Sequence, residues 1–142
     1  MLPKHKLNLK ESKSLYEKWK HLIETGYCYH NVFHVYDKNR ITFKNRGWKI
    51  AYGYYPVIEN LMARHCFIID ENNEVIDPTL IALSSFDETK EYDYYSFALY
   101  NTTEYLDMIL KHDGDVSLDK PFRHKRMEYH EMAQEEGLLF LD

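Results

Sequence analysis

The sequence predicts an α+β fold in which helices at both ends of the chain flank a central, mainly antiparallel sheet. Three observations carry this prediction. Apolar residues recur at helical spacing before residue 38 and after residue 101. The residues between them form short β-prone runs separated by turn residues. Two of these runs, 64–70 and 74–80, have the form of a hairpin, which makes neighbouring strands antiparallel.

Two helices are expected first. Residues 12–25 place their apolar side chains on one face, and Gly26 is suited to end this helix in a left-handed conformation. The next helix spans residues 28–37 and has Cys28 at its start. Residues 1–10 show no clear period and are expected to lead in irregularly.

Four strands follow, and helices close the chain. A strand over 48–55 precedes the hairpin, and a tyrosine-rich strand over 92–100 follows it. Tyrosine buries its ring while its hydroxyl keeps a polar partner, so we interpret this last run as sheet core. Asn101 and Glu104 have the spacing of a capping box and begin a helix that Gly114 closes. A last short helix is expected over 125–136.

Length and composition indicate one domain over residues 1–142, with 44% hydrophobic and 29% charged residues. The net charge of −5 and the lack of a large basic cluster argue against nucleic-acid binding. No run of about 18 apolar residues is present to span a membrane, and the N-terminus lacks the apolar core of a secretory signal. A cytoplasmic protein is therefore expected, and nothing indicates its oligomeric state.

The two cysteines do not resemble a disulfide framework, so each needs its own explanation. Cys28 stands at a predicted helix start, where partial positive charge favours the nucleophilic thiolate. The alternative for Cys28 is a small buried apolar residue, the usual role of a free cysteine. Cys66 alternates to the strand face opposite His65, and we interpret it as core.

His65 and Asp77, on the two hairpin strands, are the partners that a catalytic thiol needs: a base and a group that fixes its tautomer. The hairpin register decides whether they meet. With residues 71–73 as a three-residue loop, Asp70 pairs with Glu74. Asp77 then lies diagonally next to His65, about 7–8 Å away at the backbone. A two-residue turn would instead direct Asp77 to the other face, and the sequence permits both.

The same stretch resembles a known family. His65-Cys66-Phe67 followed by Asp77-Pro78-Thr79 is similar to the His-Ala-Trp and Asp-Pro-Thr motifs of transglutaminase-like and related papain-fold proteins. Cys28 followed by Asn31 resembles the Cys-x-x-Asn helix start of small bacterial and phage members, and Gly53-Tyr54 fits their middle strand. The resemblance covers roughly residues 26–80. It departs from the pattern after His65, and no glutamine of the papain kind precedes Cys28.

The resemblance implies a papain-like or transglutaminase-like domain, in which N-terminal helices with the nucleophile at a helix start pack on an antiparallel sheet. It implies Cys28 as nucleophile, His65 as general base and Asp77 as the residue that orients His65. The Cys28 backbone N–H is expected to form half of the oxyanion hole. The other candidates for substrate or oxyanion contacts are Tyr27, Asn31, Gly53 and Tyr54.

These residues predict a cysteine-dependent hydrolase or acyltransferase that acts on an amide, in the manner of a peptidase, amidase or deamidase. Its substrate would be a protein or a small amide, and no cofactor is expected. His30 and His34 lie four apart on a predicted helix but lack a convincing fourth ligand, so no metal site is expected. The alternative is a non-catalytic module on the same fold that binds a peptide or protein, as in a phage or bacterial interaction protein.

Overall fold

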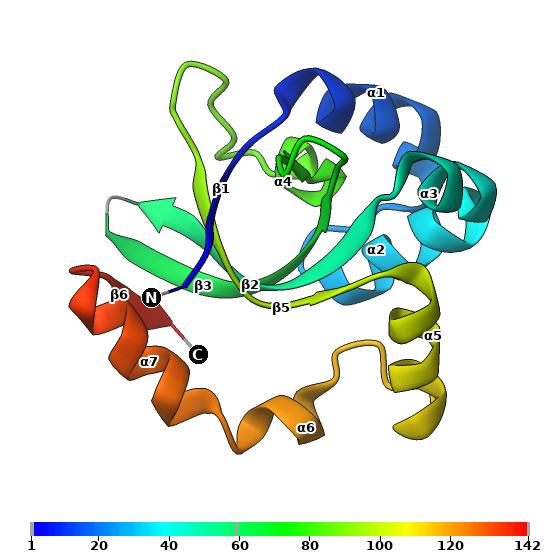
Figure 1. The fold of residues 1–142 in the computed structure, drawn as a ribbon. Helices are drawn as coiled ribbons and strands as arrows, with labels where there is room; N and C mark the ends of the chain where they lie inside the picture. Colours follow the sequence, from blue (N-terminus) through cyan, green and yellow to red (C-terminus); the bar gives the residue numbers. More distant parts are fainter. Residues whose placement is uncertain (1, 59, 142) are drawn as a thin grey trace.

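The computed structural model describes residues 2–58 and 60–141 and has an α+β architecture (Figure 1). In chain order, its elements are β1 (Lys4–Lys6), α1 (Leu9–Trp19), the short 3₁₀ helix η1 (Lys20–Leu22), α2 (Cys28–Lys38), α3 (Arg40–Arg46), β2 (Lys49–Ile58), β3 (Leu61–Ile69), β4 (Val75–Ile76), α4 (Pro78–Ala82), β5 (Asp93–Tyr100), α5 (Thr102–Lys111), α6 (Asp119–Arg123), α7 (Arg126–Glu135) and β6 (Leu139–Leu141).

The strands form one curved sheet in the order β1-β5-β2-β3-β4, with neighbouring strands antiparallel. β6 pairs with β3 in parallel. A bridge between Leu7 and Val75 joins the two ends of this order, and the Asn8 N–H donates to the Val75 carbonyl at 2.7 Å. The sheet is therefore nearly closed on itself, as the curl of the strands in Figure 1 shows.

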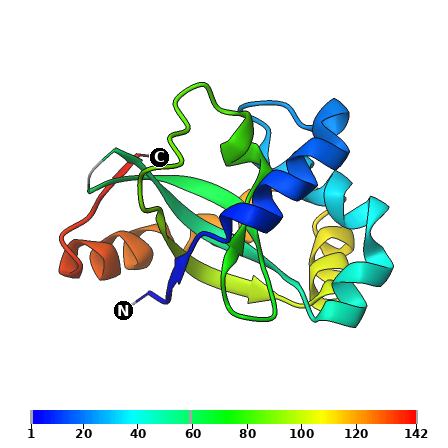
Figure 2. The same ribbon diagram turned by 90° about the horizontal axis from the view of Figure 1, so that it is seen from above.

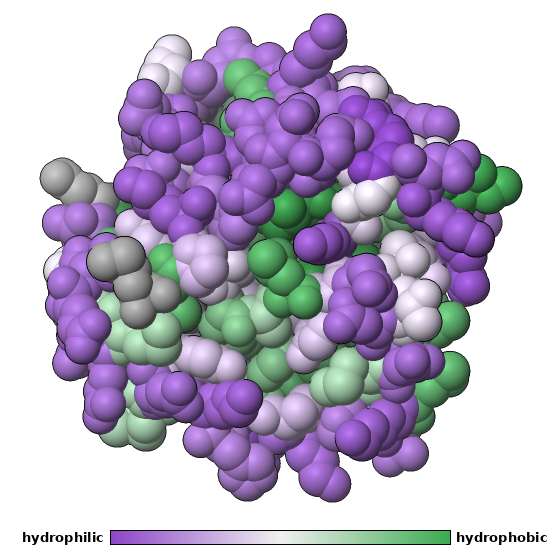
Figure 3. Space-filling model, viewed as in Figure 1, coloured by the Kyte–Doolittle hydropathy of each residue, from purple (hydrophilic) through white to green (hydrophobic). Residues whose placement is uncertain are grey.

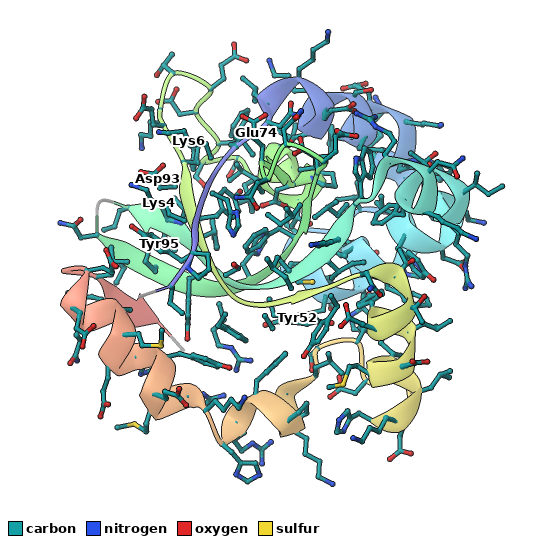
Figure 4. The ribbon with its side chains drawn as sticks, in the orientation of Figure 1. Lys4, Lys6, Tyr52, Glu74, Asp93 and Tyr95 are labelled. Carbon is teal, nitrogen blue, oxygen red and sulfur yellow. The ribbon has the colours of Figure 1, made fainter. Side chains whose placement is uncertain are left out.

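Side-chain alternation along the strands divides the core between two faces of the sheet. The inner face carries Ala51, Phe67, Ile69, Val75 and Tyr94, which form one cluster with Leu80 of α4. The outer face carries Ile50, Tyr52, Cys66 and Ile68, which belong to one cluster with residues of α2, α5 and α6. Tyr52 points from the sheet toward α6 in Figure 4, and its hydroxyl donates to the Val116 carbonyl at 2.7 Å.

The helices are spread unevenly around the sheet. Figure 2 shows α1, α2, α3 and α5 gathered at one end of the sheet and α7 at the other. In the view of Figure 3, hydrophilic side chains surround a small apolar area at the centre of the face. α1 packs against α4 and β4, which brings the start of the chain to the residues that follow the hairpin.

The β3–β4 hairpin has the three-residue loop, and the two-residue alternative does not occur. The Asp70 N–H donates to the Glu74 carbonyl at 2.8 Å. Asn73, the last loop residue, has a φ of 63°, a left-handed conformation that asparagine adopts more readily than most residues. The Asp70 carboxylate accepts from the N–H groups of Asn72 and Glu74 at 2.8 and 2.9 Å.

Several element boundaries differ from expectation at the N-terminal end. Residues 4–6 form β1 instead of an irregular lead-in, and His5 Nε2 is hydrogen-bonded to Ser96 Oγ at 2.8 Å. α1 begins at Leu9 and ends at Trp19, so Gly26, with a φ of 82°, lies in the turn before α2 and does not cap α1. The helix α2 and the capping box of α5 are confirmed.

The expected strand over 74–80 is shorter than predicted. It ends at Ile76 because Asp77 accepts a hydrogen bond from the Leu80 N–H and caps α4. Pro78 reinforces this end, since proline has no N–H for a strand ladder and suits the first turn of a helix. The short elements α3, α6 and β6 were also missed by the sequence patterns.

Candidate active site

A gap along one edge of β3 provides the place where the candidate residues meet. β4 pairs only with Ile68 and Ile69, and β6 pairs with residues 61–63. Within the described ranges, residues 64–67 therefore have no strand partner on this edge. The start of α2 packs against β3, and α4 begins directly after β4, so both helices bring their first residues to the same edge.

His65 and Asp77 form a buried ion pair on the inner face. His65 Nε2 donates to Asp77 Oδ2 at 2.7 Å, and the two side chains are 5% and 0% exposed. The hydroxyl of Tyr94 donates to the same carboxylate oxygen at 2.6 Å. Burial, followed by the charge of Asp77, raises the pKa of Tyr94 well above its ordinary value, so Tyr94 stays a neutral donor.

The backbone around Asp77 is equally well held. Its Oδ1 accepts from the Leu80 N–H at 3.3 Å, and its own N–H donates to Ser12 Oγ at 2.9 Å. The Ser12 hydroxyl in turn donates to the Asn8 carbonyl at 2.7 Å. Strand, helix cap and N-terminal segment together fix the carboxylate, so it has little freedom to turn away from His65.

Cys28 is the third member of the arrangement. It is the first residue of α2, is partly exposed, and lies close enough to the His65 ring to affect the pKa of that ring. Since Asp77 occupies Nε2, the ring nitrogen left for Cys28 is Nδ1. Burial alone lowers the pKa of His65, but the charge and hydrogen bond of Asp77 and the hydrogen bond with Cys28 outweigh it and raise the pKa to about 10.

Asn31 fixes the segment that leads into Cys28. Its side-chain oxygen accepts from the Glu24 N–H at 3.1 Å, and its Nδ2 donates to the Glu24 carbonyl at 2.7 Å. Nδ2 also donates to Thr79 Oγ1 in α4 at 3.0 Å. The amide is 1% exposed and is used by these contacts, so Asn31 positions Cys28 relative to α4 and does not face a substrate.

The start of α2 supplies backbone donors. The first intrahelical bond of α2 runs from the Asn31 N–H to the Tyr27 carbonyl at 2.8 Å. By helix geometry, the N–H groups of Cys28, Tyr29 and His30 precede this bond and have no carbonyl within the helix. The Cys28 N–H remains the candidate for one half of an oxyanion hole, and the Tyr27 ring beside it is 54% exposed.

Gly53 and Tyr54 lie on β2, the middle strand of the order β1-β5-β2-β3-β4, as the resemblance implied. Gly53 faces His65 across the β2–β3 ladder, and a Cβ there would stand 1.9 Å from the Tyr95 carbonyl oxygen. Its role is therefore to let β5 approach β2 at the bulge in that pair. Tyr54 pairs with Arg64 on the outer face and is buried with Met62, so it does not reach the site.

Two tyrosines of the site were not among the expected residues. The ring of Tyr55 lies 4.5 Å from the His65 ring, centroid to centroid. Tyr94 was expected in the sheet core, where it lies, but nothing local in the sequence signals that its hydroxyl binds Asp77. Most buried tyrosine hydroxyls have a polar partner, and that general rule was the only available sign.

The other candidate groups stay apart from the site or show no ligand geometry. Cys66 is fully buried on the outer face, and burial raises the pKa of its thiol well above the ordinary value. His30 and His34 are exposed on α2. Among the described residues, histidine, cysteine and acidic side chains do not gather in any group of three or more suited to a metal ion.

Comparison with known proteins adds no relative. No protein-family model matches the chain, and no curated protein and no solved structure matches it. Every helix in the described part of the chain is too short or too polar to cross a bilayer.

Proposed function

We propose that the protein is a cysteine-dependent hydrolase or acyltransferase of the papain-like or transglutaminase-like kind, acting on an amide of a protein or small molecule. The observation that carries the proposal is the order Cys28, His65, Asp77 around one buried imidazole. Its Nε2 binds a buried carboxylate, and its other side meets a partly exposed thiol at a helix start.

The chemistry follows from these positions. His65 already holds the proton given up by Cys28, and the Cys28 thiolate attacks the amide carbonyl, forming a C–S bond. The Cys28 N–H stabilises the oxyanion, and His65 returns its proton to the departing amine as the C–N bond breaks. Water or an amine then attacks the thioester, His65 accepts the nucleophile's proton, and the C–S bond breaks to release the Cys28 thiolate beside the imidazolium. Asp77 keeps the ring oriented and stabilises its positive charge throughout.

The proposal needs no cofactor, and it places the protein in a reducing compartment such as the cytoplasm. Cys28 and Cys66 are both free thiols. A catalytic cysteine must remain reduced, and cytosolic thiol systems maintain that state.

Alkylation of Cys28 by iodoacetamide tests the proposal. An ordinary thiol, of pKa about 8.5, is less than about 1% thiolate at pH 6. We expect Cys28 to react rapidly at pH 6 and to slow by roughly tenfold or more in His65→Ala, because the imidazolium that stabilises the thiolate is gone. Peptide mass spectrometry separates Cys28 from buried Cys66, which should stay unmodified in the folded protein. The matched control is His34→Ala, which removes an exposed histidine from α2, the helix that begins at Cys28.

Slow alkylation with an ordinary thiol profile, equal in both variants, would contradict the proposal. The chain would then be better regarded as a non-catalytic module that binds a peptide or protein. Once a substrate is known, a Cys28→Ala variant that keeps full activity would contradict it as well.

A further inference from the structure

A cavity of about 460 Å³ lies beside the site, between the end of β2 and the loop that connects α4 to β5. This volume falls within the range of small-molecule sites in proteins. Six of its lining residues carry large apolar surfaces: Tyr55, Val57, Ile58, Leu80, Leu83 and Tyr92. Val57 and Ile58 are 40% and 61% exposed, so part of this wall is open to solvent.

Two residues that line the cavity also contact the candidate catalytic residues. Tyr55 has its ring 4.5 Å from that of His65, and Leu80 donates its N–H to Asp77. Burial and then the charge of Asp77 raise the pKa of Tyr55 above its ordinary value. Cys28, His65 and Asp77 do not line the cavity themselves. A group bound there would therefore contact Tyr55 and Leu80, which in turn contact His65 and Asp77.

The charge of the lining argues for a neutral occupant. Among the described residues that line it, the charged ones are Lys90 and Glu91, of opposite sign, and Glu91 also lies 3.9 Å from Lys6 on the other side of the loop. A second cavity, of about 220 Å³, lies on that other side and shares the loop but not Tyr55 or Leu80. Only the larger of these two cavities touches residues that contact the candidate catalytic pair.

We propose that this cavity binds the acyl side of the substrate, and that the group it takes is neutral and apolar, such as an aliphatic chain or an apolar amino-acid side chain. The inference rests on the proposed function and names the substrate class of the same site. Burying one methylene group contributes about 0.8 kcal/mol, which corresponds to roughly a fourfold rate gain per methylene where the cavity is filled in the transition state.

The test uses p-nitrophenyl esters of acetate, butyrate and hexanoate, and the mono-p-nitrophenyl ester of adipate as a hexanoyl group that ends in a carboxylate. In each, the Cys28 sulfur forms a bond to the acyl carbon and p-nitrophenolate leaves, while the thiol proton passes through His65 to solvent. Release of p-nitrophenolate gives the rate, and the mass of the Cys28 peptide shows the acyl group. We expect the rate to rise from acetate to hexanoate, and the adipate ester to react more slowly than hexanoate.

Matched variants separate the cavity from the nucleophile. Ile58→Asp places a charge at an exposed position of the cavity wall, and we expect it to lower the hexanoate rate relative to the acetate rate. Ile41→Asp makes the same change on α3, where the side chain is 77% exposed and outside the cavity, and should leave the series unchanged.

The outcomes distinguish the two proposals. Acylation of Cys28 at equal rates for all four esters, or fastest with the adipate ester, would overturn the apolar subsite and leave the nucleophile standing. If no ester acylates Cys28 and its alkylation is also slow, the proposed function fails and the subsite fails with it.

Discussion

Replacing Tyr94 with phenylalanine removes one hydroxyl from the centre of the site. The hydroxyl donates to Asp77 Oδ2 at 2.6 Å, while the ring packs against Phe67 with 4.9 Å between centroids and would stay in place. Hydrogen bonds to charged groups contribute about 1.5–3 kcal/mol to stability. Because Asp77 is 0% exposed, water cannot replace the lost donor without a rearrangement. We expect the free energy of unfolding to fall by about 2 kcal/mol.

Urea unfolding at pH 7, followed by circular dichroism, measures this change. Tyr105→Phe is the matched control: Tyr105 is also 0% exposed, but its hydroxyl is buried without a partner in the described part of the chain. Removing a hydroxyl of that kind should leave stability unchanged or raise it. Equal effects of the two substitutions, or a loss below about 0.5 kcal/mol for Tyr94→Phe, would refute the reasoning, because Asp77 would then not depend on this donor.

Three further substitutions and one titration follow from the same contacts. Gly53→Ala puts a Cβ 1.9 Å from a backbone oxygen, so we expect a loss of about 3 kcal/mol in urea unfolding, and a loss below about 1 kcal/mol would contradict the packing. Asn31→Ala should lower the free energy of unfolding by roughly 2–3 kcal/mol and slow the alkylation of Cys28. Thr79→Val should lower it less, because only one of the three Asn31 hydrogen bonds is lost. Equal losses in the two variants would contradict this assignment. His65 has a folded-state pKa raised from 6.5 to about 10, so its stabilisation is complete below about pH 6.5 and is lost as the pH rises through about 10. Urea unfolding between pH 6.5 and 10 should show stability falling with pH, and His65→Gln should flatten that dependence.

The parts of the fold that were predicted correctly depend on residues close together in the sequence. The helix α2 has its own apolar period, and the loop over 71–73 fixes the hairpin register through Asp70 and Glu74. That register alone places Asp77 near His65. The antiparallel α+β arrangement follows from the same local signals.

The parts that were missed depend on contacts between distant segments. β1 has only three residues, and its position is defined by pairing with β5 about ninety residues later. Asn31 binds Thr79, on another helix, as well as nearby Glu24. Its spacing from Cys28 suggested a contact with substrate, where the structure has positioning contacts. Tyr54 is different, because strict alternation along β2 already directs it away from Gly53 and from His65. Because Gly53 and Tyr54 were considered together as one motif, the alternation was not applied to Tyr54 separately.

The contacts of Asp77 span most of the chain, and this has a consequence for biosynthesis. Its backbone N–H donates to Ser12, which precedes it by 65 residues, and its carboxylate accepts from Tyr94, which follows it by 17 residues. When the hairpin has just left the ribosome, the nascent chain therefore contains Cys28, His65 and Asp77. The Tyr94 hydroxyl, which donates to Asp77, is not yet available. Long-range pairing of this kind forms slowly and late in folding. Under the proposed function, the residues that activate Cys28 are therefore complete only after Tyr94 has also been made, which limits side reactions of the unfinished protein.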